Sequence, residues 1–360
     1  MVNWLMGKKT IKILSLPSRH PYMSKFNIGK EIKFVNPDTN LFTNTQKFSE
    51  NFLNQYYPSK SYDIVHIHFS FDRTPINQFE KILKYFHKNN KPIIWTCHSK
   101  ESLRIKGYEN GRYQKLLFQY ADQIISPTRG CAQWLSKNFG KHKNPLKVVP
   151  LGFMAHPDEV RRLDKKIKKT RNLFTMLIGD FRQNKEFVQS IMNFLQCSEL
   201  KKVKLQLIFK PINIYNENGE IKPEMVIFQS IIQHSRIRTI SLPNISNDII
   251  TKAFLASHAV ILPYKWGTHS GQIELAKDCG CHIIVSDVGY YKEQWDKIHL
   301  WKVSDKNYSE FPIRYTNALI ETYREKPLKL AGEVRKIEFN KIFNDHLNIY
   351  KNILKKKSRL

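Results

Sequence analysis

The sequence predicts an α/β protein with two doubly wound domains, each built on a parallel sheet. Short buried strands alternate with amphipathic helices along most of the chain, which is the pattern of parallel sheets. The 360 residues also exceed the usual length of a single domain. A polar, basic segment at residues 153–171 contains few strand formers and separates two such series, as a linker would. We therefore expect domains at residues 1–155 and 156–335, followed by a C-terminal helix at 336–360 that packs on the first domain.

Strand and helix patterns alternate through the first domain. The apolar residues of segment 75–89, among them Phe79, Ile82 and Phe86, recur at helical spacing. Two more helices are expected at residues 113–120 and 129–139, and strands at residues 10–16, 61–69, 92–97, 121–126 and 147–150.

The second domain repeats this alternation, and its last part, from residue 309 onward, is helical and basic. Ligands of doubly wound sheets bind at the carboxyl ends of the strands. We therefore expect the functional site in a cleft between the two domains. Strands are predicted at residues 174–178, 203–209, 238–241, 259–262 and 282–286.

The turn at residues 267–271 is the most informative local pattern. It follows a buried strand, opens a helix, and consists of Gly267, Thr268, His269, Ser270 and Gly271. Free backbone N–H groups and the positive end of the helix dipole make such a turn suitable for binding an anion, typically a phosphate. Serine and threonine also begin many helices as ordinary N-caps, so the turn alone leaves both interpretations open.

The net charge of +28 is spread over both halves of the chain. It fits three interpretations: attraction to an anionic membrane surface, a lysine-rich composition without functional meaning, or nucleic-acid binding. We expect no nucleic-acid partner, because the chain has no basic stripe with interleaved aromatic residues. Basic clusters at residues 161–171 and 355–359 favour contact with anionic lipids.

Several classes of protein are not expected. The chain contains no run of about 18 apolar residues, so no membrane span is predicted. The opening residues lack the charge order of a signal peptide. We expect a cytoplasmic protein that lies peripherally on the inner face of the cell membrane. The cysteines are scattered, so neither a disulfide framework nor a structural zinc site built from them is expected; they are Cys97, Cys131, Cys197, Cys279 and Cys281.

A series of segments, taken in order, resembles a known family. The segments are DIVHIHF, WTCHS, ADQIIS, VVPLGF, a Gly–Lys loop, GTHSG and SDVG. Over roughly residues 10–300 the chain resembles glycosyltransferase family 4 enzymes of the GT-B fold, and most closely a subgroup with a GTHSG-x-x-E segment. The resemblance implies two Rossmann-like domains. It also implies a retaining glycosyltransferase that moves a sugar from a nucleotide-diphosphate sugar to a glycan or lipid-linked acceptor in cell-surface polysaccharide or glycoconjugate synthesis.

The resemblance implies a donor site in the second domain. Segment Gly179–Lys185 is similar to the family's phosphate-binding loop, with Lys185 as its cation. The family's arginine is replaced by an aspartate here, and Arg182 is the candidate to take over its role. Such cations stabilise the charge of the leaving diphosphate.

Two glutamates of the family, eight residues apart, fall on Gly267 and Leu275, and neither is acidic. We expect Glu274 to contact the donor instead. His269 either reaches the donor or caps the helix and packs on Trp266. The remaining donor contacts are expected from Thr268, Ser270, Gly271 and Gln272.

On the acceptor side, His98 follows a buried strand where the family carries a histidine of the sugar cleft. It is the predicted catalytic histidine, available for proton movement near neutral pH. His68 shares a strand face with His66 and lies nearer the strand end. His20 and Tyr22, in the first strand–helix turn, are predicted acceptor contacts.

The implied transfer proceeds on one face of the sugar and needs neither a protein nucleophile nor a metal. No cofactor is expected beyond the nucleotide-sugar donor. Two alternatives stay open: sugar-phosphate or phosphorylase chemistry on the same fold, and a catalytically degenerate scaffold that binds a glycan or a partner protein.

Overall fold

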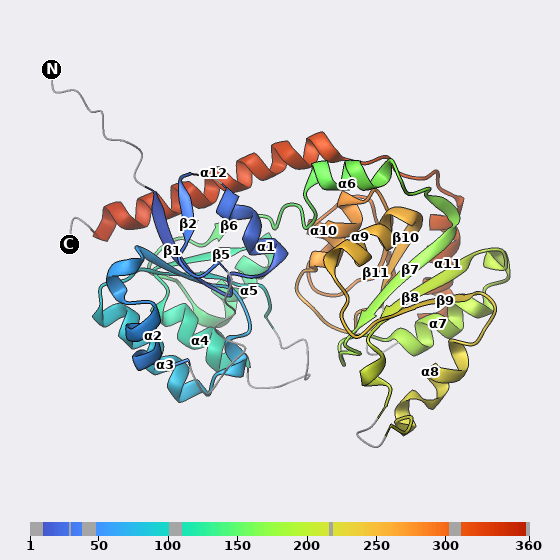
Figure 1. The fold of residues 1–360 in the computed structure, drawn as a ribbon, viewed down its shortest axis with the longest axis horizontal. Coiled ribbons are helices and arrows are strands. Elements are labelled where there is room, and N and C mark those ends of the chain that lie inside the picture. Colours follow the sequence, from blue (N-terminus) through green and yellow to red (C-terminus); the bar gives the residue numbers. More distant parts are fainter. Residues whose placement is uncertain are drawn as a thin grey trace. The chain divides into compact units, whose positions relative to one another are not determined.

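The computed structural model describes residues 10–28, 30–37, 48–100, 110–215, 219–301 and 311–357. The chain divides into two compact units. The first consists of Met1–Glu101, Gly107–Gly152 and Glu338–Leu360, and the second of Ser102–Lys106 and Phe153–Ile337. Each unit contains one six-stranded parallel sheet, so the predicted fold class is confirmed (Figure 1).

The sheet of the first unit has the strand order β2-β1-β3-β4-β5-β6. Five of these strands were predicted, and the three-residue β2 was missed. The strands are β1 (Ile11–Leu16), β2 (Ile32–Phe34), β3 (Ile64–Ile67), β4 (Ile93–Thr96), β5 (Gln123–Ser126) and β6 (Lys147–Val148).

Helices of the first unit bury the faces that their spacing predicted. Phe79, Ile82 and Phe86 of α3 are fully buried, and the Thr128 side chain caps α5 by accepting the Cys131 N–H. The helices are α1 (Pro21–Ser24), α2 (Glu50–Tyr56), α3 (Ile76–Lys88), α4 (Asn110–Tyr120) and α5 (Arg129–Phe139), with 3₁₀ turns η1 (Lys25–Ile28), η3 (Ser59–Ser61) and η4 (Phe71–Arg73).

The sheet of the second unit has the order β12-β11-β10-β7-β8-β9. Its edge strand β12 was missed, because its four residues, Ile-His-Leu-Trp, mix apolar and polar types at the end of a loop-rich stretch. The strands are β7 (Thr170–Gly179), β8 (Lys204–Phe209), β9 (Ile237–Ser241), β10 (Ser257–Leu262), β11 (His282–Ser286) and β12 (Ile298–Trp301).

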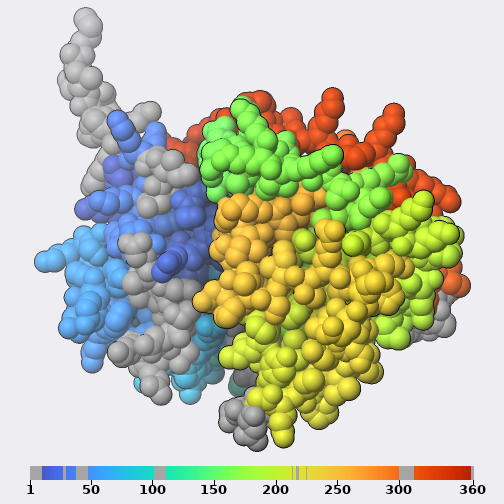
Figure 2. All heavy atoms as spheres, turned by 45° about the vertical axis from the view of Figure 1, so that its right-hand side comes forward, coloured from blue at the N-terminus to red at the C-terminus, as the bar shows by residue number. Residues whose placement is uncertain are grey.

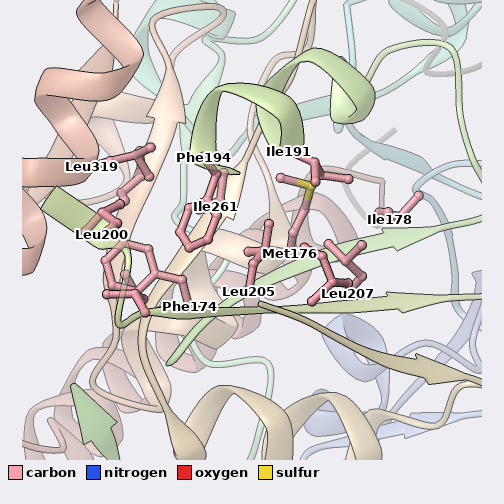
Figure 3. Close-up of a cluster of buried hydrophobic side chains, with 14 of the residues drawn as sticks. Phe174, Met176, Ile178, Ile191, Phe194, Leu200, Leu205, Leu207, Ile261 and Leu319 are labelled. Carbon is pink, nitrogen blue, oxygen red and sulfur yellow. The ribbon is translucent and has the colours of Figure 1, made fainter. Parts of the chain in front are cut away.

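Alternation along these strands builds a core on each face of the second sheet. Phe174, Met176 and Ile178 of β7 point to one face, where they pack with Phe194 and Leu319 of two covering helices (Figure 3). The opposite face carries the other strand positions, whose core also contains residues of three further helices, α6, α9 and α10. The helices of this unit are α6 (Pro157–Asp164), α7 (Phe187–Gln196), α8 (Val226–Ile231), α9 (Asn247–Ala256), α10 (Gly271–Asp278) and α11 (Phe311–Arg324), with 3₁₀ turns η5 (Ser198–Leu200), η6 (Pro211–Asn213), η7 (Pro223–Met225) and η8 (Tyr291–Glu293).

The expected linker at residues 153–171 is wrong, because α6 occupies its middle. His156 caps this helix, and Val160 and Leu163 bury its apolar side. The helix packs on α9. In Figure 2, the green surface that includes α6 adjoins the orange surface of later residues of the second unit. The exposed arginines on the other side of α6 gave this segment the composition of a linker.

The last helix, α12 (Gly332–Lys357), begins among residues of the second unit. From Glu338 onward its residues belong to the first unit, where Ile342, His346 and Tyr350 are buried. Among the described helices, none combines the length and the hydropathy that crossing a bilayer requires.

Candidate functional site

The turn at residues 267–271 lies at the carboxyl end of β10 and opens α10. Ser270 is the N-cap of α10: its hydroxyl accepts the Gln272 N–H at 3.2 Å and lies 2.9 Å from the Tyr264 hydroxyl. The loop after β11 packs directly on this turn, since the Tyr290 N–H donates to the Thr268 carbonyl at 2.9 Å. Gly289 has φ of +62°, and a Cβ there would collide with the backbone of Gly267.

Gln294 holds the Ser270 backbone from both sides. Its Oε1 accepts the Ser270 N–H at 2.7 Å, and its Nε2 donates to the Ser270 carbonyl at 3.1 Å. The same Nε2 donates to Glu274 Oε1 at 2.9 Å. Sequence reasoning missed Gln294, although it lies in the same short segment as the SDVG motif.

Glu274 is 4% exposed and forms a buried ion pair. Its Oε2 lies 2.8 Å from an Arg335 terminal nitrogen, and Arg335 Nε donates to Asp278 Oδ1 at 2.6 Å. Asp278 Oδ2 in turn accepts the backbone N–H groups of Met154 and Ala155. Both oxygens of Glu274 are therefore engaged inside the second unit. Glu274 and Asp278 lie one helical turn apart, so their spacing was a signal for a shared cation, but nothing local marked Arg335 as that cation.

The Gly179–Lys185 loop leaves the carboxyl end of β7. Gly179 has φ of +67°, a conformation that favours glycine. Lys185 is 7% exposed, and its Nζ donates to the carbonyls of Leu177 and Ile178 at 2.6 and 3.2 Å. Burial, with a smaller contribution from the neighbouring Arg182 charge, lowers the pKa of Lys185 to about 7.

Arg182 is much more exposed than Lys185. Its nearest guanidinium nitrogen lies 3.9 Å from Asp180, whose other oxygen lies 2.8 Å from Lys210 Nζ. Asp180 thus lies between two cations at the surface of this loop.

Backbone hydrogen bonds join this loop to the chain that follows β10. Lys185 forms an antiparallel bridge with Tyr264, the Glu186 N–H donates to Pro263, and the Lys265 N–H donates to Asn184. The Lys185 ammonium lies 5.7 Å from the centre of the Tyr264 ring, whose hydroxyl contacts Ser270. The ring of Tyr264 thus faces Lys185 and its hydroxyl contacts Ser270. The structure therefore brings these two residues, both predicted on the donor side, to one tyrosine.

Two amide oxygens near these loops lack hydrogen-bond partners among the described residues. They are Asn184 Oδ1 and Gln272 Oε1, both buried. The adjacent His269 is partly buried, and burial lowers its pKa to about 3. It is therefore a neutral imidazole at pH 7. Buried polar atoms of this kind normally find a partner, so these oxygens are available to a ligand.

In the first unit, four predicted residues from three separate segments lie together. His68 Nδ1 and His98 Nε2 are 3.4 Å apart, and the Tyr22 ring packs edge-on at 4.7 Å from His98 and 5.7 Å from His68. His20 caps α1 by accepting the Tyr22 N–H, and its ring packs on Phe69. His68 Nε2 is buried and has no hydrogen-bond partner in the described part of the chain.

His66 packs against this cluster and links it to neighbouring elements of the first unit. Its ring lies 3.9 Å from that of His68, which confirms that the two share a strand face. Its nitrogens lie 2.8 Å from the Tyr350 hydroxyl and 2.8 Å from Thr96 Oγ1. Burial is the main cause that lowers the pKa of both His66 and His68. Sequence reasoning missed His346 and Tyr350; their four-residue spacing on a C-terminal helix was the available signal.

We expect Arg335→Leu to destabilise the second unit by about 3–5 kcal/mol, because it leaves two buried carboxylates without their cation. The neighbouring Lys336 is half-exposed and pairs with Asp158 at the surface, so Lys336→Ala should change the free energy of unfolding much less. Chemical denaturation monitors both. Equal effects from the two variants would contradict the importance of the buried pair, and Glu274→Gln should partly rescue Arg335→Leu.

The first unit should lose stability as the pH falls below about 6.5. Burial lowers the pKa of His346 from 6.5 to about 4, so the unfolded chain binds more protons than the folded chain between these values, and unfolding becomes easier. Melting temperatures measured from pH 7 to pH 4 should fall, and His346→Leu should flatten the decline. The exposed His87→Gln serves as control; an unchanged slope in His346→Leu would show that other groups cause the loss.

Comparisons with known proteins agree with this architecture. The family model of Glycosyltransferase Family 4 matches residues 27–154, most of which belong to the first unit. No curated protein matches the sequence. Among solved structures, HepE of Anabaena in complex with UDP is 13% identical, with a TM-score of 0.60, and the match covers 98% of this chain and 100% of that one.

Two further solved structures show the same likeness. The α,α-trehalose 6-phosphate synthase of Burkholderia multivorans is 10% identical, with a TM-score of 0.57 and 98% of each chain covered. The pneumococcal O-GlcNAc transferase GtfA, in complex with UDP and GlcNAc, is 12% identical with a TM-score of 0.56; the match covers 85% of this chain but only 60% of GtfA. At these identities the likeness shows the fold alone. The chain therefore has the GT-B fold, and its predicted resemblance to Glycosyltransferase Family 4 is confirmed.

Proposed function

We propose that this protein is a retaining, metal-independent glycosyltransferase that uses a nucleotide-diphosphate sugar. The observation that carries the proposal is the joined pair of loops in the second unit, with Lys185 and Ser270 on either side of Tyr264. Similarity to structures that contain UDP or UDP-glucose supports a nucleotide-sugar donor.

The donor diphosphate would bind at the N-terminus of α10. The positive end of the helix dipole there attracts phosphate oxygens, although the Ser270 and Gln272 N–H groups already have partners within the unit. Arg182, and Lys185 in its charged form, add positive charge, which stabilises the diphosphate as it leaves. Thr268, His269, Gly271 and Gln272 line the same turn and would complete the donor contacts.

The pKa of Lys185 gives this proposal a specific signature. At a pKa of about 7 roughly half of the side chain is uncharged at pH 7. A bound diphosphate favours the charged ammonium, so binding should draw a proton from solution. Affinity should therefore rise as the pH falls from 8 to 6.

We assign Glu274 a role in positioning the donor. Its carboxylate holds Gln294, and Gln294 holds both backbone groups of Ser270. Glu274 would thus fix the position of the Ser270 turn at the start of α10. This arrangement replaces the family's pair of glutamates, which are Gly267 and Leu275 here.

The acceptor would bind in the first unit beside His98. His98, with His68, His20 and Tyr22, presents imidazole nitrogens and a phenol ring that can hydrogen-bond sugar hydroxyls and pack on a sugar face. A departing phosphate oxygen takes the proton of the acceptor hydroxyl as the new glycosidic bond forms on the face that the phosphate leaves. The acceptor class that we propose is a glycan or a lipid-linked precursor.

A catalytically inactive scaffold that binds a glycan or a partner protein is the second candidate. Both oxygens of Glu274 are bound within the second unit, which favours this second candidate. Gly267 and Leu275, at the positions of the family's glutamates, have no carboxylate that could replace Glu274. The two candidates differ in whether a nucleoside diphosphate binds and whether sugar is transferred.

We expect Lys185→Met to lower the affinity for the preferred nucleoside diphosphate at least tenfold, because one fixed cation is lost while the buried aliphatic stem is kept. Thermal-shift screening of the wild type against UDP, GDP, ADP and TDP first identifies that nucleotide; a ligand at about 100 times its Kd stabilises the fold by about 2.7 kcal/mol. Calorimetry then compares Lys185→Met with the exposed Lys252→Met. A folded wild type that responds to no nucleotide would favour the scaffold.

We also propose peripheral association with an anionic membrane through the basic end of α12. The other basic cluster is less available, since Lys169 and Arg171 donate to backbone carbonyls of their own unit. In the last turn of α12, Lys355 and Lys356 are exposed, and Lys356 donates to Asn144. Residues 358 and 359 of the predicted cluster lie outside the described residues.

Replacing Lys355 and Lys356 by Gln should weaken binding to anionic vesicles about 25-fold, since each lysine near such a surface contributes about 1 kcal/mol. Co-sedimentation with phosphatidylglycerol vesicles measures the effect, and phosphatidylcholine vesicles give the uncharged reference. The exposed pair Lys84 and Lys252 replaced by Gln is the matched control. Wild-type protein that ignores both kinds of vesicle would rule out the association.

A further inference from the structure

Three metal-ligating side chains converge at the amino ends of two strands in the second unit. His282 is the first residue of β11, His299 is the second residue of the neighbouring β12, and Glu325 follows the last residue of α11. The two strands are parallel and adjacent. This cluster therefore lies at the edge of the sheet opposite to the Ser270 turn, and the proposed sugar transfer does not use it.

The spacing of the three groups matches a tetrahedral cation. His282 Nδ1 lies 3.3 Å from Glu325 Oε2, and His299 Nε2 lies 3.1 Å from Glu325 Oε1. One ligand atom from each residue can be chosen so that all lie within 4.8 Å of one another. Zinc–ligand bonds of about 2.0–2.1 Å at tetrahedral angles place neighbouring ligand atoms roughly 3.3 Å apart. Each histidine nitrogen lies at about this distance from one oxygen of Glu325, His282 from Oε2 and His299 from Oε1.

One ring nitrogen of His282 is bound and the other faces the carboxylate. His282 Nε2 lies 2.9 Å from the Lys326 carbonyl oxygen, and only an N–H group can donate to a carbonyl. His282 Nδ1 lies 3.3 Å from Glu325 Oε2, is buried, and has no hydrogen-bond partner in the described part of the chain. Buried polar atoms normally have a partner, so Nδ1 is available to a ligand.

Surrounding groups orient the ring in the way that metal-binding histidines usually require. The donation from Nε2 to a backbone carbonyl fixes the tautomer that offers Nδ1. His258 packs against the His282 ring at 4.8 Å and is itself held by the Thr322 carbonyl. The Glu325 side chain is 48% exposed, so water can reach a fourth coordination position.

We propose that His282 Nδ1, His299 Nε2 and the Glu325 carboxylate bind one Zn²⁺ ion, with water as the fourth ligand. Two imidazoles and a carboxylate are a ligand set that zinc accepts. The ion ties the edge strand β12 to β11 and to the end of α11, so it stabilises the second unit and takes no part in the transfer. The sequence analysis predicted no metal, because these ligands are far apart along the chain and form no recognised motif.

Equilibrium dialysis of the untagged, full-length protein against buffered Zn²⁺ tests the proposal directly. We expect one zinc per chain and a raised melting temperature. Glu325→Gln and His299→Ala should each weaken zinc binding at least tenfold. Both side chains are at least 17% exposed, so the variants should fold. The exposed Glu321→Gln, one turn earlier on α11, should bind zinc as the wild type does.

Cobalt substitution identifies the ligands independently. Co²⁺ at the proposed site should give a visible tetrahedral spectrum without a thiolate charge-transfer band. A thiolate band would assign the metal to cysteines and overturn the proposal. So would a wild type that binds no zinc, or variants at Glu325 and His299 that bind it unchanged.

Discussion

The buried guanidinium of Arg335 is the interaction on which the candidate donor site depends. It lies between Glu274 and Asp278 of α10, and all three side chains are almost fully buried. Removing one partner of such a group leaves a charge in a low-dielectric interior, so the arrangement is stable only when complete. Because Glu274 also holds Gln294, and Gln294 holds Ser270, the ion pair sets the direction of the turn that opens α10. The stability of α10 and the position of the turn that opens it therefore depend on one network.

The parallel sheet of the second unit separates two kinds of chemistry. All carboxyl ends of its strands lie at one edge, where the loops after β7 and β10 meet through Lys185 and Tyr264. The amino ends lie at the other edge, where His282 and His299 begin neighbouring strands. One edge thus gathers groups suited to an anion, and the other gathers groups suited to a cation.

Much of the fold could be predicted from the sequence, because buried parallel strands are short apolar runs between turn residues. Segments such as Phe174–Ile178 carry that signal without help from their neighbours. The three-residue β2 and the edge strand β12 carry too few apolar residues to stand out. The helix α6 was mistaken for a linker because its exposed side is strongly charged while its buried side holds only Pro157, Val160 and Leu163.

The candidate site was predictable where chemistry is local and hidden where it depends on distant contacts. Lys185 and Ser270 lie in the loops that follow β7 and β10, and parallel topology places both loops at the same edge of the second sheet. His98 follows β4 of the first sheet in the same way. Arg335 and Tyr350 acquire their roles only when a helix far along the chain reaches them. The spacing of apolar residues along the sequence does not indicate which distant side chains these residues contact. Whether a buried glutamate faces a ligand or a cation of its own chain is decided by those contacts.

The path of α12 has a consequence for how the protein is made. The first unit is completed by residues from Glu338 onward, after the whole second unit has been synthesised. At roughly 5–20 residues per second, the ribosome needs about 10–40 s to pass from Gly152 to Glu338. During that interval His66 lacks its partner Tyr350, and the buried residues of α12, such as Ile342 and His346, are missing from the core of the first unit. The core of the first unit is therefore complete only after the C-terminal helix has been synthesised.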